Sequence, residues 1–160
     1  MKIPISIVYE DDLSGCLLRK LLKNNFEISA EYNKHGFGDI KKKIFGYNQA
    51  ALHSYFLVLT DLDTAECAPG LINDWLPDKK QSNLIFRVAV KEIESWILAD
   101  RENFAAFLGI SSDHIPFQCD NIQNPKELLM NLVRKSRKRS LKEDILPRYD
   151  GDRIGPYYNG

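Results

Sequence analysis

The sequence lacks the features of membrane-spanning, secreted and cysteine-rich proteins. No apolar run in its 160 residues approaches the roughly 20 that cross a bilayer, and no signal-like apolar segment follows Met1. The three cysteines are far apart and form no Cys-x-x-Cys or Cys/His cluster, so neither a disulfide framework nor a zinc site is indicated. We therefore expect a cytoplasmic chain with no membrane partner.

An excess of either charge is also missing. The 22 basic and 22 acidic residues cancel, so any attraction to nucleic acid must come from a local patch of the surface. With 44% hydrophobic residues, the composition is that of an ordinary globular protein. The length is that of one domain with one core.

Apolar runs alternate with amphipathic segments over the first two thirds of the chain. The runs are rich in β-branched and aromatic residues, as strands are. The sequence predicts strands at 3–9, 26–33, 55–60 and 82–90, a loop at 34–38, and helices at 12–25, 41–53, 65–75 and 92–108, the third delayed by Pro69-Gly70. This alternation predicts an α/β fold with a mostly parallel, Rossmann-like sheet flanked by helices.

The last third is polar and basic, and we predict a helical, basic extension at 109–160 packed on an α/β domain of residues 1–108. It comprises a loop, a helix that begins at Pro125, and a turn-rich tail at 147–160 that lacks an apolar face. The tail is expected to be either a surface extension or a chain that stops before a further element. Six of the nine residues from 134 to 142 are basic. They either bind nucleic-acid phosphates or form a solvated helix end favoured by the helix dipole. The candidate contacts are Arg134, Lys135, Arg137, Lys138 and Arg139.

Two aspartates follow directly on the apolar run at 55–60. Residues i and i+2 of an extended chain project to the same side, so Asp61 and Asp63 are expected to point together from the carboxyl end of this strand. Open α/β sheets bind ligands at that edge. The pair either caps the next helix or, because two close carboxylates repel, binds Mg²⁺ or Mn²⁺.

Acidic residues also follow two other predicted strands. Glu10 follows strand 3–9, and Glu92 and Glu94 follow strand 82–90. If these strands flank the one at 55–60 in parallel, all three acidic clusters emerge at one edge and suit one or two divalent ions, which can activate water for attack on a phosphodiester. Glu92 and Glu94 diverge by about 200° once a helix has begun, so only one of them is expected to be a ligand.

Glu10, the Asp61-Leu-Asp63 sequence and the Glu94-Ser-Trp96 segment resemble the Toprim domain, the catalytic α/β module of primases, type IA and II topoisomerases and OLD-type nucleases. The chain is more closely similar to small stand-alone Toprim-like proteins of bacteria, some of them encoded beside ATPases in anti-phage systems. The resemblance covers residues 1–108 and is most specific over 88–100. It implies a Mg²⁺- or Mn²⁺-dependent nuclease with an ATPase as a candidate partner. The expected substrate is nucleic acid, DNA in preference to RNA.

The resemblance also assigns roles to residues. Glu10 would be the general acid/base or the first metal ligand, with Asp61 and Asp63 as further metal ligands. Glu94, which lies in a Glu-x-Trp sequence like that of the family, would be the additional carboxylate. Lys126 or the basic run at 134–139 would supply a cation that contacts the nucleic acid and stabilises the transition state.

One position departs from the family pattern. OLD-type nucleases carry a second acidic residue about one helical turn after the first glutamate, and this chain has Leu13-Ser14-Gly15 there. Asp11 or Asp12 would have to substitute for it. One metal ion is therefore expected rather than two.

Two other functions stay open. Glu10, Asp11 and Asp12 before a leucine-rich helix, with Asp61 at the end of a later strand, also resemble a receiver domain in which Asp61 is phosphorylated. Receivers, however, carry a lysine, usually followed by proline, at the end of a fifth strand, and no such strand is predicted after residue 90. The missing second glutamate also fits a catalytically silent Toprim-like subunit that regulates an ATPase.

Overall fold

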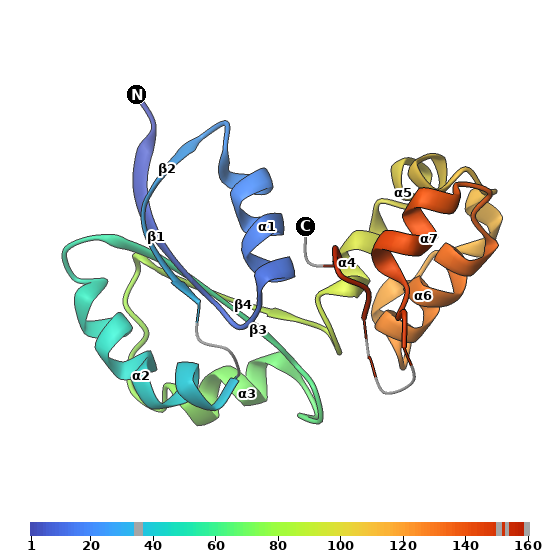
Figure 1. Ribbon diagram of the computed structural model, residues 1–160. Coiled ribbons are helices and arrows are strands. Elements are labelled where there is room, and N and C mark those ends of the chain that lie inside the picture. Colours follow the sequence, from blue (N-terminus) through green and yellow to red (C-terminus); the bar gives the residue numbers. More distant parts are fainter. Residues whose placement is uncertain (34–36, 150–151, 153, 159–160) are drawn as a thin grey trace. The chain divides into compact units, whose positions relative to one another are not determined.

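The computed structural model describes residues 1–33, 37–149, 152 and 154–158. The chain divides into two compact units, residues 1–90 and 91–160 (Figure 1). Within the described residues, the first unit holds every strand, and the second consists of helices and turns. The boundary that the sequence places after residue 108 falls inside the second unit.

The first unit is a four-stranded sheet with helices between its strands. Its elements are β1 (Ile3–Tyr9), α1 (Asp12–Leu22), β2 (Phe26–Asn33), α2 (Phe37–Ala50), β3 (Tyr55–Asp61), α3 (Ala68–Trp75) and β4 (Leu84–Ala89). The strand order is β2-β1-β3-β4, and all neighbouring strands are parallel. The predicted α/β fold is confirmed, as are the three strands predicted to be parallel neighbours. The predicted loop at 34–38 falls in part on residues 34–36, which lie outside the described chain.

The place of each strand in the sheet follows from its sequence pattern. β1 and β3 lie in the middle, and each has five consecutive buried residues, as expected for a strand covered on both faces. β2 is an edge strand in which partly buried and exposed residues largely alternate. Val8 pairs with Val58, so β1 and β3 run side by side toward their carboxyl ends.

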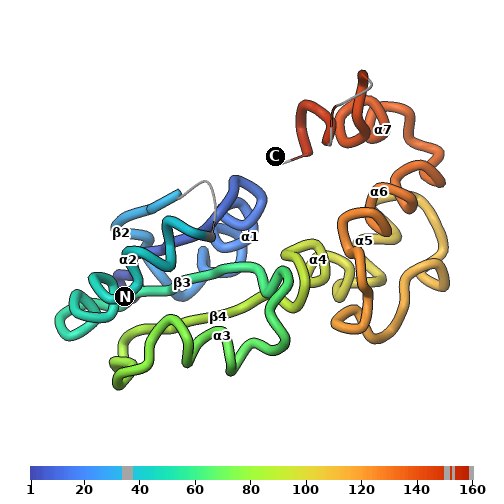
Figure 2. Tube along the Cα trace, turned by 90° about the horizontal axis from the view of Figure 1, so that it is seen from below, coloured from blue at the N-terminus to red at the C-terminus, as the bar shows by residue number. Residues whose placement is uncertain are grey.

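Helices cover both faces of this sheet. Figure 1 shows α1 on one face and α2 and α3 on the other. Beneath α2 and α3 lies a continuous apolar core that includes Ile44, Trp75 and Val58. α3 begins only at Ala68, with Pro69 in its first turn, so the delayed start is confirmed. Figure 2 shows α3 running back beside β4, the strand that follows it.

The second unit is helical. Its elements are α4 (Glu94–Ala99), α5 (Arg101–Leu108), the 3-10 turns η1 (Ser112–His114) and η2 (Cys119–Asn121), α6 (Pro125–Lys135) and α7 (Arg139–Ile145). The helix predicted from 92 to 108 is in fact two helices, because the backbone of Asp100 leaves the helical region at ψ = 57°. Gly109 ends α5 in the left-handed conformation, as the sequence indicates. No helix in the described chain has the length and apolar character needed to cross a membrane.

The tail is not the surface extension that its polar sequence predicts. Gly155 is buried, and its N–H donates to the carbonyl oxygen of Ile145 at 2.9 Å. The N–H of Tyr157 donates to the carbonyl oxygen of Asp144, also at 2.9 Å, and Tyr158 is buried. The tail therefore folds back onto α7, a helix that the sequence pattern also missed.

Candidate functional site

The strand order creates a topological switch point between β1 and β3. From β1 the chain continues to β2 on one side of the sheet, whereas from β3 it continues to β4 on the other. Connections that leave in opposite directions open a crevice at the carboxyl ends of the two strands, where α/β proteins bind ligands. Glu10 follows β1 directly, and Asp61 is the last residue of β3. Two of the predicted site residues thus lie at the position where this fold offers a site.

Glu10 is held in place by the neighbouring strand. Its Oε1 accepts a hydrogen bond from Thr60 Oγ1 and another from the backbone N–H of Asp61 at 3.1 Å. Burial raises the pKa of the Glu10 carboxyl, as do the charges of Asp11 and Asp63, while the two hydrogen bonds act in the opposite direction. A carboxylate in this position is oriented but electrostatically strained, and a bound cation would relieve the strain.

Asp63 reaches this neighbourhood by a route that the sequence pattern did not predict. β3 ends at Asp61, so the rule that alternate residues share a side does not extend to Asp63. The backbone of Asp63 turns with φ = 50°, a conformation that few non-glycine residues adopt. Aspartate and asparagine adopt it more often than other non-glycine residues do. Leu62 anchors the turn because its side chain is buried and its N–H donates to the carbonyl oxygen of Ala89 at 2.8 Å.

A hollow of about 410 Å³ opens beside this turn, lined by the β3–α3 loop, α3 and Lys41 of α2. Asp63, Glu66 and Asp74 contribute carboxylates to its wall, and Lys41 pairs with Asp74 at 2.6 Å. The hollow gives the acidic end of β3 a concave neighbour in which a ligand has room. Its lining is more acidic than basic.

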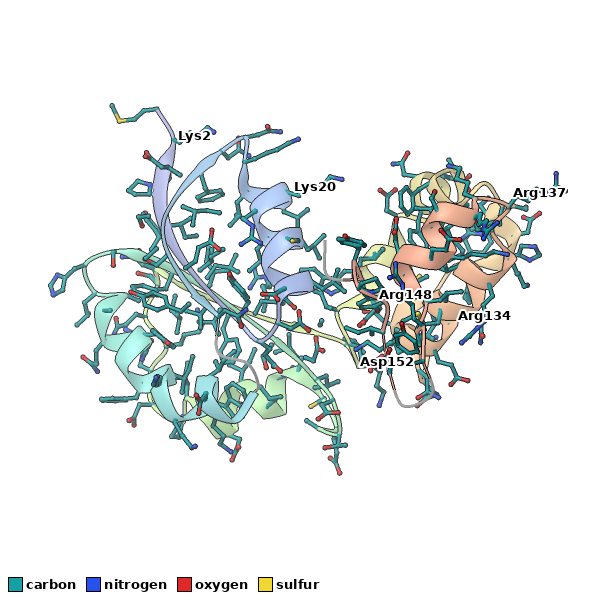
Figure 3. The ribbon with its side chains drawn as sticks, viewed as in Figure 1. Lys2, Lys20, Arg134, Arg137, Arg148 and Asp152 are labelled. Carbon is teal, nitrogen blue, oxygen red and sulfur yellow. The ribbon has the colours of Figure 1, made fainter. Side chains whose placement is uncertain are left out.

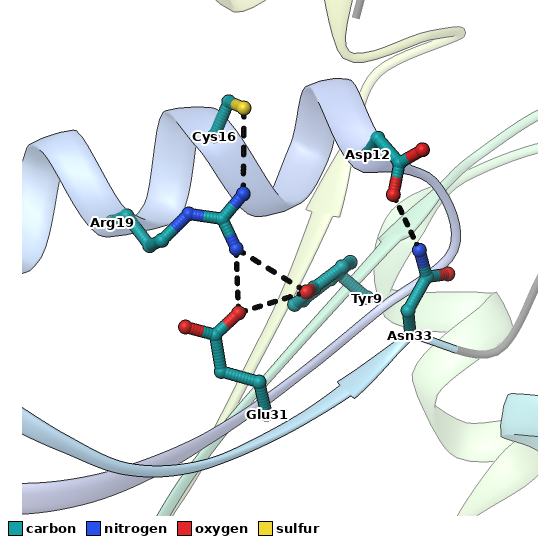
Figure 4. A network of polar contacts seen from close by, with 6 residues as sticks. All are labelled: Tyr9, Asp12, Cys16, Arg19, Glu31 and Asn33. Atoms are coloured by element: carbon teal, nitrogen blue, oxygen red, sulfur yellow. Dashed lines mark hydrogen bonds and ion pairs between the residues drawn. The ribbon is translucent and has the colours of Figure 1, made fainter. Parts of the chain in front are cut away.

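The other acidic residues after β1 have structural partners. Asp11 caps α1, its carboxylate accepting the N–H of Ser14 at 2.8 Å. Asp12 accepts a hydrogen bond from Asn33 Nδ2 at 2.7 Å and so links α1 to the end of β2 (Figure 4). The carboxylates that would have to replace the family's second acidic ligand therefore already stabilise the α1 start.

A second polar network surrounds Tyr9, the last residue of β1. Tyr9 donates to Glu31 at 2.9 Å, and Arg19 pairs with Glu31 at 2.5 Å while contacting Cys16 at 3.4 Å (Figure 4). Burial, and then the hydrogen bond with Glu31, raises the pKa of the Tyr9 hydroxyl. The network ties β1, α1 and β2 together next to the candidate site.

In the second unit, Glu92 and Glu94 have different partners. Glu92 accepts the N–H of Lys126 at 3.0 Å and so satisfies a backbone donor in the first turn of α6. Glu94 is the first residue of α4, its side chain is 2% exposed, and its Oε1 accepts a 2.5 Å hydrogen bond from the hydroxyl of Tyr158. Lys126 Nζ lies 3.4 Å from the same oxygen and 5.7 Å from the centre of the Tyr158 ring. The convergence of Glu94 with Glu10, Asp61 and Asp63 stays a prediction.

The predicted nucleic-acid contacts lie in α6, α7 and the linker between them. Arg134 and Lys135 end α6, Arg137 and Lys138 lie in the linker, and Arg139 begins α7. Figure 3 shows Arg134 and Arg137 extending away from the ribbon of their unit. All five side chains are exposed, whereas Lys126 is partly buried against Glu94.

The carboxylates at the ends of β1 and β3 are suitable ligands for a divalent cation, but in the described residues they are not arranged closely enough to coordinate one. Carboxylate oxygens are the ligands that Mg²⁺ and Mn²⁺ prefer, and the pKa of Glu10 reports the nearby charges of Asp11 and Asp63. Among the described residues, no group of three or more acidic, histidine or cysteine side chains is close enough to hold a metal. Binding therefore requires side-chain movement of Glu10, Asp61 or Asp63.

Sequence reasoning missed two residues that the structure brings into play. Thr60 was counted as part of the apolar run, yet its hydroxyl orients Glu10. The signal that could have identified Thr60 is a single hydroxyl residue directly before the acidic end of the strand. Tyr158 lies in a tail without periodic apolar residues, so no local pattern could have paired it with Glu94.

Comparison of the chain with protein-family models, curated proteins and solved structures gave no match.

Proposed function

We propose that the chain is a Toprim-like, Mg²⁺- or Mn²⁺-dependent nuclease that cleaves phosphodiester bonds in nucleic acid. The observation that supports this most is the position of Glu10, which lies at the switch point of a parallel sheet and is held there by Thr60 and by the N–H of Asp61. Ligand sites of open α/β sheets occur at this point. An effector role beside an ATPase in anti-phage defence, and DNA as the substrate, are parts of the same proposal.

The residues of the first unit would divide the chemistry as follows. Glu10, Asp61 and Asp63 would hold one divalent ion, which supplies a more acidic water and neutralises charge on the phosphodiester. Thr60 keeps the Glu10 carboxylate oriented through its hydroxyl. The alternative role for Glu10 is that of the general acid/base in place of a metal ligand, which suits a carboxyl whose pKa is raised by burial and nearby charge.

In the second unit, Glu94 and Lys126 would support the same reaction. The family resemblance expects one further carboxylate and one cation, and these two side chains form an ion pair at 3.4 Å. The hydroxyl of Tyr158 holds the carboxylate in one orientation. In this proposal Glu94 supplies the additional carboxylate and Lys126 supplies the cation.

A receiver-like phosphoacceptor is the second candidate. The order β2-β1-β3-β4 is also the order of the first four strands in flavodoxin-like folds, and Asp61 ends β3 as a phosphoacceptor would. Against this, β4 is the last strand of the described chain, so the fifth strand that carries the receiver lysine has no counterpart there. A silent regulatory subunit is the third candidate, favoured by the structural use of Asp11 and Asp12.

Cleavage of plasmid DNA and of RNA by the purified chain in Mn²⁺, with and without its genomic neighbour, tests the proposal. Glu10→Gln keeps the size and the acceptor oxygen of the side chain but removes its charge, so we expect cleavage to fall by at least about 100-fold. Glu27→Gln, the same substitution on an exposed residue of β2, is the matched control and should leave cleavage unchanged.

One result would reject the nuclease, and another would reject the site assigned to it. Uptake of phosphate at Asp61 from acetyl phosphate, without cleavage, would establish the receiver. Loss of cleavage in Glu27→Gln equal to that in Glu10→Gln would show that the activity does not come from the β1–β3 edge.

A further inference from the structure

The linker between α6 and α7 is fixed on the carboxyl end of α5. Ser136 Oγ donates to the carbonyl oxygen of Leu108 at 2.6 Å, and Lys138 Nζ donates to the carbonyl oxygen of Phe107 at 2.6 Å. The hydroxyl of Ser136, which is buried, also accepts the N–H of Lys138 at 3.1 Å. These bonds satisfy carbonyls that a helix end leaves unpaired, and a cation is favoured there by the helix dipole. The basic linker thus has one defined position.

This position brings Lys138 next to an exposed aromatic ring. Phe107 is 48% exposed, and Lys138 Nζ lies 5.8 Å from the centre of its ring. Phe104 stacks against the same ring, with 6.3 Å between centroids and 25° between the planes. The ring of Phe107 is therefore held from within the protein while part of its surface is open to solvent.

Most of the positive charge in residues 134–142 has no carboxylate partner among the ion pairs of the described residues. The segment from 134 to 142 has six basic residues and no acidic one. In the described part of the chain, the carboxylate that pairs with this segment is Glu143, which binds Arg139 at 2.7 Å. Arg134 donates to the side-chain amide oxygen of Asn131 at 2.7 Å, and Figure 3 shows Arg134 and Arg137 extending outward.

We propose that Phe107, with Lys138 beside its ring and with Arg134, Lys135 and Arg137 of the adjoining α6 end and linker, forms a binding surface for single-stranded nucleic acid. Surfaces of this kind bind phosphates with cations and stack the bases on aromatic rings. In a duplex, each base is already covered by its neighbours and cannot lie on Phe107. A single-stranded segment is therefore the form of nucleic acid that uses both features.

A membrane surface fits the same residues less well. Peripheral binding to a bilayer needs an apolar helix face directed outward. In α6, the apolar residues Leu129, Met130, Leu132 and Val133 are buried within the protein. One exposed ring beside basic residues provides a stacking position and not an apolar face.

Fluorescence anisotropy of the full chain in EDTA tests this proposal, with labelled oligothymidylate of about 16 nucleotides, a duplex of equal length and anionic vesicles as probes. We expect Phe107→Ala to weaken binding of the single strand by about tenfold and to leave duplex binding unchanged. Phe107→Leu, which keeps the apolar contact with Phe104, should weaken it as well. Phe45→Ala is the matched control because Phe45 is 57% exposed on α2, where Lys41 and Lys42 are paired with Asp74 and Asp39.

The cations are tested by salt dependence. Replacing Arg134 and Arg137 by glutamine should reduce the slope of log K against log salt concentration by about 1.4 for the single strand, about 0.7 for each lost phosphate contact. An unchanged affinity in Phe107→Ala, an unchanged slope in the double variant, or binding to the vesicles in preference to the oligonucleotide would overturn the proposal. Because EDTA excludes metal-dependent chemistry, these outcomes are independent of whether the chain is a nuclease.

Discussion

The two units of the chain use their acidic residues in opposite ways. In the first unit, Glu10 stands at the end of β1 with a raised pKa, because burial and the charges of Asp11 and Asp63 disfavour its ionised form. In the second, Glu92 accepts a backbone N–H of α6, and Glu94 is bound by Tyr158 and Lys126. The second pair is satisfied by its surroundings, whereas Glu10 is positioned at a cost in stability, as expected of a group retained for function.

The two units also differ in the sign of their exposed charge: the first has an acidic hollow, and the second has a basic surface. The hollow beside β3 has three carboxylates and one lysine in its wall, while the surface formed by α6, α7 and their linker is basic. The net charge of zero hides this difference, since the two tendencies cancel in the sum. An acidic site suited to a cation and a basic surface suited to phosphates are together what a metal-dependent nuclease requires.

The largest effect is expected where the tail is attached in the second unit. A Cβ on Gly155 would lie 2.5 Å from the carbonyl oxygen of Asp144 and 2.5 Å from the carbonyl carbon of Ile145, both backbone atoms that cannot easily move. We expect Gly155→Ala to lower the free energy of unfolding by about 3 kcal/mol in urea denaturation. Gly46→Ala in α2, where a Cβ meets no atom within 4 Å, should instead stabilise the protein by about 0.5 to 1 kcal/mol.

Equal stability of Gly155→Ala and the wild type would mean that the tail does not hold its docked position in solution. The contrast between a satisfied Glu94 and a strained Glu10 would then fail, because the tail carries Tyr158.

A smaller loss is expected from the hydroxyl that binds Glu94. Tyr158→Phe removes a hydrogen bond to a charged group whose side chain is 2% exposed, so we expect destabilisation by about 2 kcal/mol in the same measurement. Tyr157→Phe, at a neighbouring tyrosine that is 63% exposed, is the control and should have no effect. Similar values for the two variants would show that Glu94 does not depend on Tyr158.

The smallest effect should have the opposite sign. The raised pKa of Glu10 means that the folded state holds this proton more tightly than the unfolded chain does. Protonated Glu10 therefore stabilises the folded state at pH values below its pKa in the unfolded chain. This stabilisation is lost as the pH rises through the pKa of Glu10 in the folded protein. We therefore expect Glu10→Gln, measured in EDTA, to match the wild type at low pH and to be more stable at pH 7. A variant less stable at pH 7 would assign Glu10 a structural role like that of Glu94.

The sequence predicted those features that depend on local patterns. β1, β3 and β4 were found because buried parallel strands are continuous apolar runs, and Glu10 and Asp61 could be placed at one edge because parallel strands share their direction. The switch from strand to turn at Asp63 was missed, since it depends on the burial of Leu62.

The second unit was harder to predict for a physical reason. α7 is seven residues long and has no fully buried residue, so its sequence carries little periodic signal. The folding back of the tail depends on the close approach of Gly155 to another backbone segment, which is a tertiary contact. The partners of Glu92 and Glu94 also depend on tertiary contacts, those of α4 with α6 and with the tail. The sequence spacing therefore identified the two residues but not the contacts that they make.

The central claim is that a divalent ion binds at the carboxyl ends of β1 and β3, and the paramagnetic effect of Mn²⁺ on the backbone amide signals in NMR tests it most directly. We expect Mn²⁺ to broaden the amides of residues 10–12 and 60–63 first, because bound Mn²⁺ relaxes nearby protons. Asp61→Asn should abolish this broadening, because Asp61 is one of the proposed ligands. Broadening that also reaches Glu94 would add this residue to the ligands. Broadening centred elsewhere, or broadening at β1 and β3 that persists in Asp61→Asn, would contradict the account.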